Sequence, residues 1–516
     1  MKQLEDQLAP APSTLRHKHT AWWYLALALY SFFLLASTCY IASHRHLWFD
    51  EIDTFFIGTL PSLKAIWHTL LLGTDGQPLG FYFPVHLSYL LFGSSELSLR
   101  LCAIVPFWLT TLVLYYAVAR RTSPLYGFIA ALTPAFTVAF QYSFEARPYA
   151  MVLLFSACSF LAWQFAKEQR MRALSVPAIG IAIAAAIYVH YNALLIVIPI
   201  LIGELAYTSQ KRKIDFPVLI ALCLSGIPLL LSLPHIHAIH AYSKNYWSHI
   251  AFSTLFDIYF ILATKFVVIA IIAAALFAFW LGVRRSVLRH LKADFGQLPG
   301  YEVAAAGGYL LLPVACFILA IYTKALHYRY VIATIIGFSL LVPFLLWMFR
   351  SVAAKAAGAL CIVLVLNLLY TGLSRMRAPD EESWGTYAEY SDLFSPHTKQ
   401  IYDSAQPLIL GDGPFLVAAK YGSLALRTRA FYPVSDTSQS NNSPAVFRGL
   451  SSAVPGPFHL VDFEQFKQSH PTFLMYDPED WVLNQVLAEG DQVDLIAHLP
   501  HAMLYGVTVK ARTVKH

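Results

Sequence analysis

Long apolar runs recur along most of this chain, and they limit its fold more than any other feature. A run of about 20 apolar residues is long enough to cross the hydrocarbon core of a membrane as a helix. Charged residues make up only 13% of the 516 residues, whereas soluble domains carry about 25%. The sequence therefore predicts a polytopic α-helical membrane protein, in which the net charge of +6 indicates loop topology rather than nucleic-acid binding.

Basic residues between the runs assign each loop to a side, because cytoplasmic loops are rich in Lys and Arg. Arg16 and Lys18 place the tail, residues 1–20, in the cytoplasm, and the later basic loops fit eleven spans within residues 21–374 if Gly80–Phe92 is re-entrant. That segment is shorter than a helix normally needs to span the hydrocarbon core of a membrane. The predicted spans are Trp22–Ala42, Leu97–Ala119, Leu125–Gln141, Tyr149–Ala166, Val176–Val189, a sixth ending at Lys211, Val218–Leu233, Ile258–Val283, Val303–Tyr322, Tyr330–Phe349 and Ala356–Ser374.

The first outer loop, residues 44–96, begins with the adjacent carboxylates Asp50 and Glu51. Apolar residues then follow the i, i+3, i+4 spacing of a helix face and restart after Pro61-Ser62, which predicts two short helices lying in the interface. A carboxylate beside a bilayer is expensive to desolvate and commonly has a task. The alternative is that Asp50 only caps a helix N-terminus and Glu51 favours its first turn.

Strand-like and helical runs alternate in residues 375–516, which predicts a small α/β domain. An odd number of spans places this domain outside the cytoplasm. The six cysteines all lie in apolar runs, so we expect buried thiols and no disulfide framework.

Polar residues gather at the predicted outer ends of the helices. Each has a structural alternative: Glu145 and Arg147 could pair, His190 and Tyr191 could form an interfacial belt, and Arg329 could extend to the interface. Their common position instead predicts a polar active site at the outer face. The set comprises Asp50, Glu51, Gln77, Glu145, Arg147, Tyr149, His190, Tyr191, Asn192, Lys324, Arg329 and Tyr330.

Four segments of the chain give residues 20 to 375 a resemblance to the GT-C superfamily. They are Asp50-Glu51, the stretch from Gly93 to Leu101, the stretch from Ser143 to Ala150, and Arg329-Tyr330. The pattern is similar to the dolichyl-phosphate-mannose–protein mannosyltransferase-like group, which includes bacterial aminoarabinose transferases. That group usually has His-Pro-Pro-Leu-Tyr-Tyr where this chain has Gln77 to Tyr82. The C-terminal domain also resembles one attached to bacterial members.

The resemblance implies a bacterial inner-membrane glycosyltransferase, moving a sugar from a polyprenyl-phosphate donor to an acceptor at the outer leaflet. The acceptor, whether glycan, lipid or protein, stays open. Inverting transfer needs a carboxylate base and fixed positive charge on the departing phosphate. We expect Asp50 to be the base, with Glu51 second or orienting it, and Arg329, Lys324 and Arg147 to bind the phosphate. The substrate-binding candidates are Glu145, Tyr149, His190, Tyr191, Asn192 and Tyr330.

Three other readings compete with this one. His235, His237 and His240 have spacing that can bind zinc, but no carboxylate or cysteine accompanies them, so we expect no required cofactor or metal. A transporter or lipid flippase would carry charged residues at mid-depth on several spans, and those are rare here. A non-catalytic scaffold that binds through the outer domain is the third.

Overall fold

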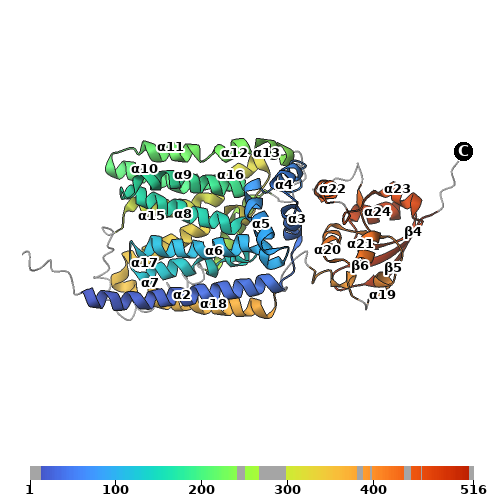
Figure 1. Cartoon of the computed structure of the whole chain (residues 1–516), viewed down its shortest axis with the longest axis horizontal. Helices are drawn as coiled ribbons and strands as arrows, with labels where there is room; N and C mark the ends of the chain where they lie inside the picture. The colour runs from blue at the N-terminus through green and yellow to red at the C-terminus, as the bar shows by residue number, and fades with distance from the viewer. Residues whose placement is uncertain are drawn as a thin grey trace, which may run out of the picture.

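The computed structural model describes residues 13–240, 250–265, 298–379, 387–395, 398–434, 443–454 and 456–510. A bundle of long helices forms one end of the molecule, and a sheet flanked by helices forms the other (Figure 1). The predicted class, a helical membrane protein with a small C-terminal α/β domain, is confirmed.

Seven described helices are long and apolar enough to cross a membrane, or eight if a pair bent by 57° counts as one span. The bent pair is Phe216–Leu231 with Leu233–His240 and contains α11 (Phe216–Leu224), α12 (Ile227–Leu231) and α13 (Leu233–His240). The seven are formed by α2 (Ser13–His44), α6 (Glu96–Ala119), α8 (Tyr149–Lys167), α9 (Arg172–Val189), η4 (Tyr191–Ile196) with α10 (Val197–Lys211), α15 (Gly300–Gly308) with η7 (Tyr309–Leu311) and α16 (Leu312–Thr323), and α18 (Arg350–Arg377).

Two predicted spans are shorter than expected. The third is a nine-residue helix, α7 (Pro124–Leu132), followed by two 3-10 turns, η2 (Pro134–Phe136) and η3 (Val138–Ser143). Pro134 cannot donate a helical hydrogen bond, which explains the break. The tenth is α17 (Thr334–Met348), with only 15 residues. Most of the predicted eighth span lies outside the described residues, so the count of eleven stays a prediction.

The two predicted interfacial helices are present as α3 (Phe49–Gly58) and α4 (Leu63–Leu70). The Ser62 hydroxyl caps α4 by accepting a hydrogen bond from the Ala65 N–H at 3.2 Å. The expectation that Asp50 could be an N-cap is wrong, because Trp48 occupies that position and both acids lie in the first turn. The predicted re-entrant segment is a 14-residue helix, α5 (Leu79–Phe92).

The C-terminal domain contains a six-stranded sheet in the order β3-β2-β1-β4-β6-β5. β3, β2, β1 and β4 are parallel neighbours, and β6 runs antiparallel to both β4 and β5. The strands are β1 (Leu408–Leu410), β2 (Ala430–Val434), β3 (Leu460–Asp462), β4 (Thr472–Tyr476), β5 (Gln492–His498) and β6 (Met503–Thr508). The helices and turns of this part are η9 (Ser391–Leu393), α19 (Lys399–Tyr402), α20 (Asp412–Tyr421), α21 (Leu424–Arg429), α22 (Ser443–Ala453), α23 (Phe463–Ser469) and α24 (Asp480–Ala488).

This domain docks on the interfacial helices, with α20 against α3 and α22 against α4 (Figure 1). The Tyr421 hydroxyl accepts a hydrogen bond from the Leu47 N–H at 2.8 Å and donates to Glu96 at 3.2 Å. The Lys420 ammonium lies 3.4 Å from the centre of the Phe55 ring, a favourable cation–π distance. These contacts fix the domain over the end of the bundle.

A fully buried ion pair joins α3 to the bundle. Both side chains of Arg100 and Glu51 are 0% exposed, and they form two hydrogen bonds of 2.8 and 2.6 Å. Arg100 also donates to the carbonyl oxygens of Ala42, Arg45 and His46. These hydrogen bonds and the ion pair offset the desolvation cost of burying the two charges.

Removing Arg100 should therefore destabilise the protein strongly. Arg100→Met leaves Glu51 buried without its counter-charge, which typically costs about 3–5 kcal/mol. The double variant Glu51→Leu/Arg100→Leu should recover much of that loss. The measurement is the thermal unfolding midpoint in detergent, with Arg172→Met as a control because Arg172 is 30% exposed in its pair with Asp215. An Arg100→Met midpoint equal to the wild type would contradict this assignment.

The direction of the helices is also testable. A reporter fused after Ser374 should be active outside the cytoplasm, and a cysteine in place of Arg121 should react only with a reagent supplied from the cytoplasm. The reason is that basic loops are retained on the cytoplasmic side. Labelling of position 121 from outside would mean that α5 spans the membrane.

Candidate active site

A cavity of about 1600 Å³ lies where the C-terminal domain covers the end of the helix bundle. Pockets for one small ligand typically have about 300–1,000 Å³, so this cavity has room for two substrates. Its walls come from α3, the turn after α4, the segments that begin α8 and η4, α13, the end of α16 with the residues that follow it, and loops of the C-terminal domain.

Nine of the twelve polar residues that the sequence places at the outer ends of the helices line this cavity. They are Asp50, Gln77, Arg147, Tyr149, His190, Tyr191, Asn192, Arg329 and Tyr330. Residues from five separate segments of the bundle therefore converge on one space.

The other three predicted residues, Glu51, Glu145 and Lys324, are not part of the cavity wall. Glu51 points into the bundle, where burial disfavours its charge but Arg100 more than offsets this and lowers its pKa. Glu145 is buried and pairs with Arg45 at 3.1 Å, not with Arg147. Lys324 is exposed at the C-cap of α16 with a left-handed φ of 58°.

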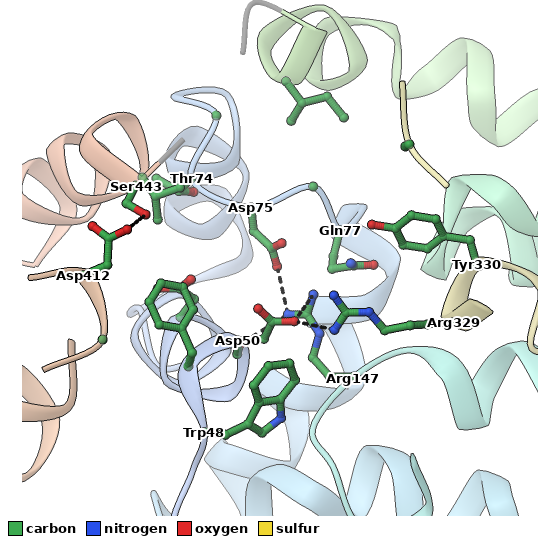
Figure 2. Close-up of a pocket in the computed structure, with 18 of the residues that line it drawn as sticks. Trp48, Asp50, Thr74, Asp75, Gln77, Arg147, Arg329, Tyr330, Asp412 and Ser443 are labelled. Carbon is green, nitrogen blue, oxygen red and sulfur yellow. Dashed lines mark hydrogen bonds and ion pairs between the residues drawn. The ribbon is translucent and has the colours of Figure 1, made fainter. Parts of the chain in front are cut away.

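Asp50 forms ion pairs with both arginines that the sequence proposed for phosphate binding (Figure 2). Its Oδ2 atom is 3.0 Å from Nη1 of Arg329 and 3.6 Å from Nη2 of Arg147. The Asp50 side chain is 23% exposed and that of Arg147 only 6%. Arg147 also donates to the Asp50 carbonyl and the Thr54 hydroxyl, which fixes its guanidinium in the wall of the cavity.

Sequence reasoning missed Asp75, a second carboxylate beside Arg147. Its Oδ2 atom lies 3.7 Å from Nη1 of Arg147 (Figure 2). The same atom accepts a hydrogen bond from the Tyr82 hydroxyl at 2.5 Å. The available signal was the polar turn Gly73-Thr74-Asp75-Gly76 directly before Gln77. Asp75 therefore helps to orient the cation rather than standing alone.

Asp53, one turn after Asp50 on α3, is a third carboxylate in the wall that was missed. Its side chain is 8% exposed, and its Oδ1 atom has no hydrogen-bond partner among the described residues. Burial and the neighbouring carboxylates Asp75 and Asp50 hold its pKa well above the usual value. A protonated Asp53 would offer a hydrogen-bond donor to the cavity.

Aromatic rings line the side of the cavity next to the arginines. The His190 ring lies between Tyr149, at 5.6 Å, and Tyr330, at 5.4 Å between ring centres. Burial, together with Arg147 and Arg329, lowers the pKa of His190 to about 3. His190 is therefore neutral at physiological pH and leaves the positive charge here to the arginines.

The C-terminal domain contributes carboxylates to the opposite wall. Asp412 accepts a hydrogen bond of 2.6 Å from the Ser443 hydroxyl (Figure 2). It accepts another of 2.6 Å from the Tyr432 hydroxyl. Glu479 accepts one from the Asp412 N–H at 3.1 Å, and burial together with Asp412 raises the pKa of Glu479 to about 7. No local sequence signal connected these residues with Asp50.

Within the residues that the structure describes, no three His, Cys, Asp or Glu side chains are grouped closely enough to hold a metal ion. His235, from the predicted histidine cluster, instead contacts the Tyr191 hydroxyl at 2.8 Å and the Asp75 carbonyl at 2.9 Å.

Comparison with known proteins finds one matching family model and several solved structures of similar fold. Residues 76–238 match the family model described as dolichyl-phosphate-mannose-protein mannosyltransferase, whereas no curated protein matches the chain. The fold is similar to that of ArnT from Cupriavidus metallidurans in the apo state, with a TM-score of 0.55 and 12% identity over 95% of this chain and 98% of ArnT. ArnT bound to undecaprenyl phosphate gives a TM-score of 0.53 and 12% identity over 94% and 98%. The chain is therefore similar to this mannosyltransferase family over residues 76–238, and its overall fold is similar to that of ArnT.

Proposed function

We propose that this protein transfers a sugar from a polyprenyl-phosphate-linked donor to an acceptor at the outer face of the bacterial inner membrane. The observation that carries the proposal is the convergence of two arginines on one carboxylate inside a cavity at the end of a membrane bundle. The match to a mannosyltransferase family model and the likeness to a protein crystallised with undecaprenyl phosphate support it.

The donor phosphate would bind to Arg147 and Arg329. Both guanidinium groups line the cavity and already bind one anionic group, Asp50. Guanidinium groups bind phosphate oxygens in a bidentate manner, and these bonds strengthen when water is excluded. Positive charge fixed at this point would stabilise the phosphate as it leaves the sugar.

The polyprenyl tail would leave the cavity between α13 and α16 rather than beside α5. Ile236 and Ile239 of α13 and Tyr322 of α16 line the cavity. Near α5, only the turn that precedes the helix lines the cavity, and no residue of the helix itself does so. Tyr322 is 78% exposed, and the nearby apolar residues Ile318 and Leu231 are each more than half exposed. An apolar exit that faces lipid suits a polyprenyl chain.

Asp50 would act as the base once the donor phosphate has replaced it as the ion-pair partner of the two arginines. The acceptor oxygen attacks the anomeric carbon from the face opposite the phosphate, the bond from carbon to phosphate oxygen breaks, and polyprenyl phosphate leaves with the electron pair. The acceptor proton passes to Asp50. Attack from the opposite face inverts the configuration at that carbon.

The outer-face assignment is supported by the charges at the other end of the bundle. Arg120, Arg121 and Lys167 all lie there, at the ends of α6 and α8 that point away from the cavity. They pair with the acidic residues Glu168, Glu302, Glu204 and Asp215. Basic helix ends are typical of the cytoplasmic side.

Arg329→Lys should weaken binding of undecaprenyl phosphate about tenfold while leaving the protein folded, because lysine cannot reproduce bidentate binding. The measurement is the dissociation constant of the purified protein in nanodiscs. Lys324→Asn is the matched control, since Asn tolerates the left-handed backbone at this position and the residue lies outside the cavity wall. Equal affinity in wild type and Arg329→Ala would remove Arg329 from the phosphate site.

Asp50→Asn should reduce turnover by about 10²–10⁴, the usual range for loss of a general base. Asparagine keeps the shape and can still accept a hydrogen bond from Arg329, so the protein should fold and bind undecaprenyl phosphate. The assay follows release of labelled sugar from its polyprenyl phosphate into an acceptor fraction of membranes. If Asp50→Asn turns over at the wild-type rate and Asp75→Asn does not, Asp75 is the base.

A further inference from the structure

The sheet of the C-terminal domain presents its topological switch point to the cavity. β1 and β4 are adjacent and parallel, so their carboxyl ends lie at the same edge. From β1 the chain builds β2 and β3 on one side, and β4 then lies on the other side of β1. In open α/β sheets, ligands bind in the crevice outside the carboxyl ends at such a reversal.

The residues that follow these two strands are acidic and line the cavity. Asp412 comes two residues after β1, and Asp477 and Glu479 follow β4. Asp477 has a left-handed φ of 46°, an uncommon conformation that often marks a functional site. The hydroxyls of Tyr432 and Ser443 hold Asp412 in place. Preorganised carboxylates therefore occupy the position where this type of sheet binds a ligand.

An independent sign of a ligand comes from the facing wall. Asp53 of α3 is 92% buried, yet its Oδ1 atom lacks a hydrogen-bond partner among the described residues and the side chain lines the cavity. Buried polar atoms nearly always have a hydrogen-bond partner. A ligand in the cavity would supply the partner that this oxygen lacks. Asp412 is among the charges that raise the pKa of Asp53, after burial, Asp75 and Asp50. The two walls thus face a common space.

The two arginines of the described wall, with Asp50 and Asp75 beside them, lie at one end of the cavity. Figure 2 shows Arg147 and Arg329 together at one end and Asp412 at the other. A second phosphate group would be repelled at the acidic end, whereas hydroxyl and ammonium groups would donate charge-assisted hydrogen bonds. Tyr390 and Trp481 add flat apolar surfaces. The described wall contains Asp50, Asp53, Asp75, Glu389, Asp412, Asp477, Glu479 and Asp480 against the two arginines.

We propose that the carboxyl edge of β1 and β4, together with Asp53, binds the acceptor, and that the acceptor is a carbohydrate whose hydroxyl or amino groups form hydrogen bonds with these carboxyl groups. This inference rests on the proposed function and assigns the acceptor class for it. Neutral and amine-bearing glycans fit the site, and phosphorylated glycans do not. The acceptor reaches Asp50 from the side opposite the donor phosphate, as inversion requires.

The test uses the full-length protein in nanodiscs and an immobilised panel of neutral, amine-bearing and phosphorylated oligosaccharides. We expect binding to neutral or amine-bearing members only. Asp477→Asn/Glu479→Gln should weaken that binding at least about tenfold, and Asn suits the left-handed position 477. Asp494→Asn is the control, because Asp494 is an exposed residue of β5 outside the cavity wall.

Four results would overturn the inference. They are binding of phosphorylated members alone, binding of no member, wild-type binding by the double variant, and binding of Mg²⁺ or of a protein substrate alone at these carboxylates. The proposed function is judged separately by the affinity of the Arg329 variants for undecaprenyl phosphate. Failure of the undecaprenyl phosphate measurement would therefore leave the oligosaccharide-binding result unchanged. Failure of the oligosaccharide test would likewise leave the donor measurement unchanged.

Discussion

The site depends on one buried ion pair, Arg100 with Glu51. This pair holds together the end of α2, the first turn of α3, and α6, and the Ala146 N–H donates to Glu51 at 2.7 Å. The segment that carries Arg147 is therefore tied to the same carboxylate. Because charges buried in this way tolerate little displacement, the pair fixes where the neighbouring Asp50 and Arg147 enter the cavity.

The long helices and most strands could be predicted from the sequence, because apolar length and alternation are local properties. The distinction between Asp50 and Glu51 could not. Neighbouring helical residues point about 100° apart, so one carboxylate faces the cavity and the other faces Arg100. Which is which depends on a partner 49 positions away in the chain. Likewise, the third span looked continuous in its apolar composition, although Pro134 divides it.

The cavity wall formed by the C-terminal domain could not be predicted from the sequence either, because it also depends on contacts between distant parts of the chain. Asp412, Asp477 and Glu479 follow ordinary strands, and only the docking of α20 on α3 brings them opposite Asp53. That docking depends on contacts such as Tyr421 with Leu47, which are separated by 374 positions. Neither hydropathy nor motif spacing contains this information. By contrast, the residues near the bundle end were predictable as a group, since helix ends on one side of a membrane lie at one level.

A cavity whose walls come from both ends of the chain also sets an order of events in biogenesis. Asp50 is synthesised early, but the wall formed by Asp412 and Glu479 exists only after nearly all 516 residues have been made and the last sheet has folded. Domains generally fold in the order of synthesis. A nascent chain can therefore insert its helices before the second wall of the cavity exists. The cavity takes its full form only when the C-terminal sheet has folded and docked on α3 and α4.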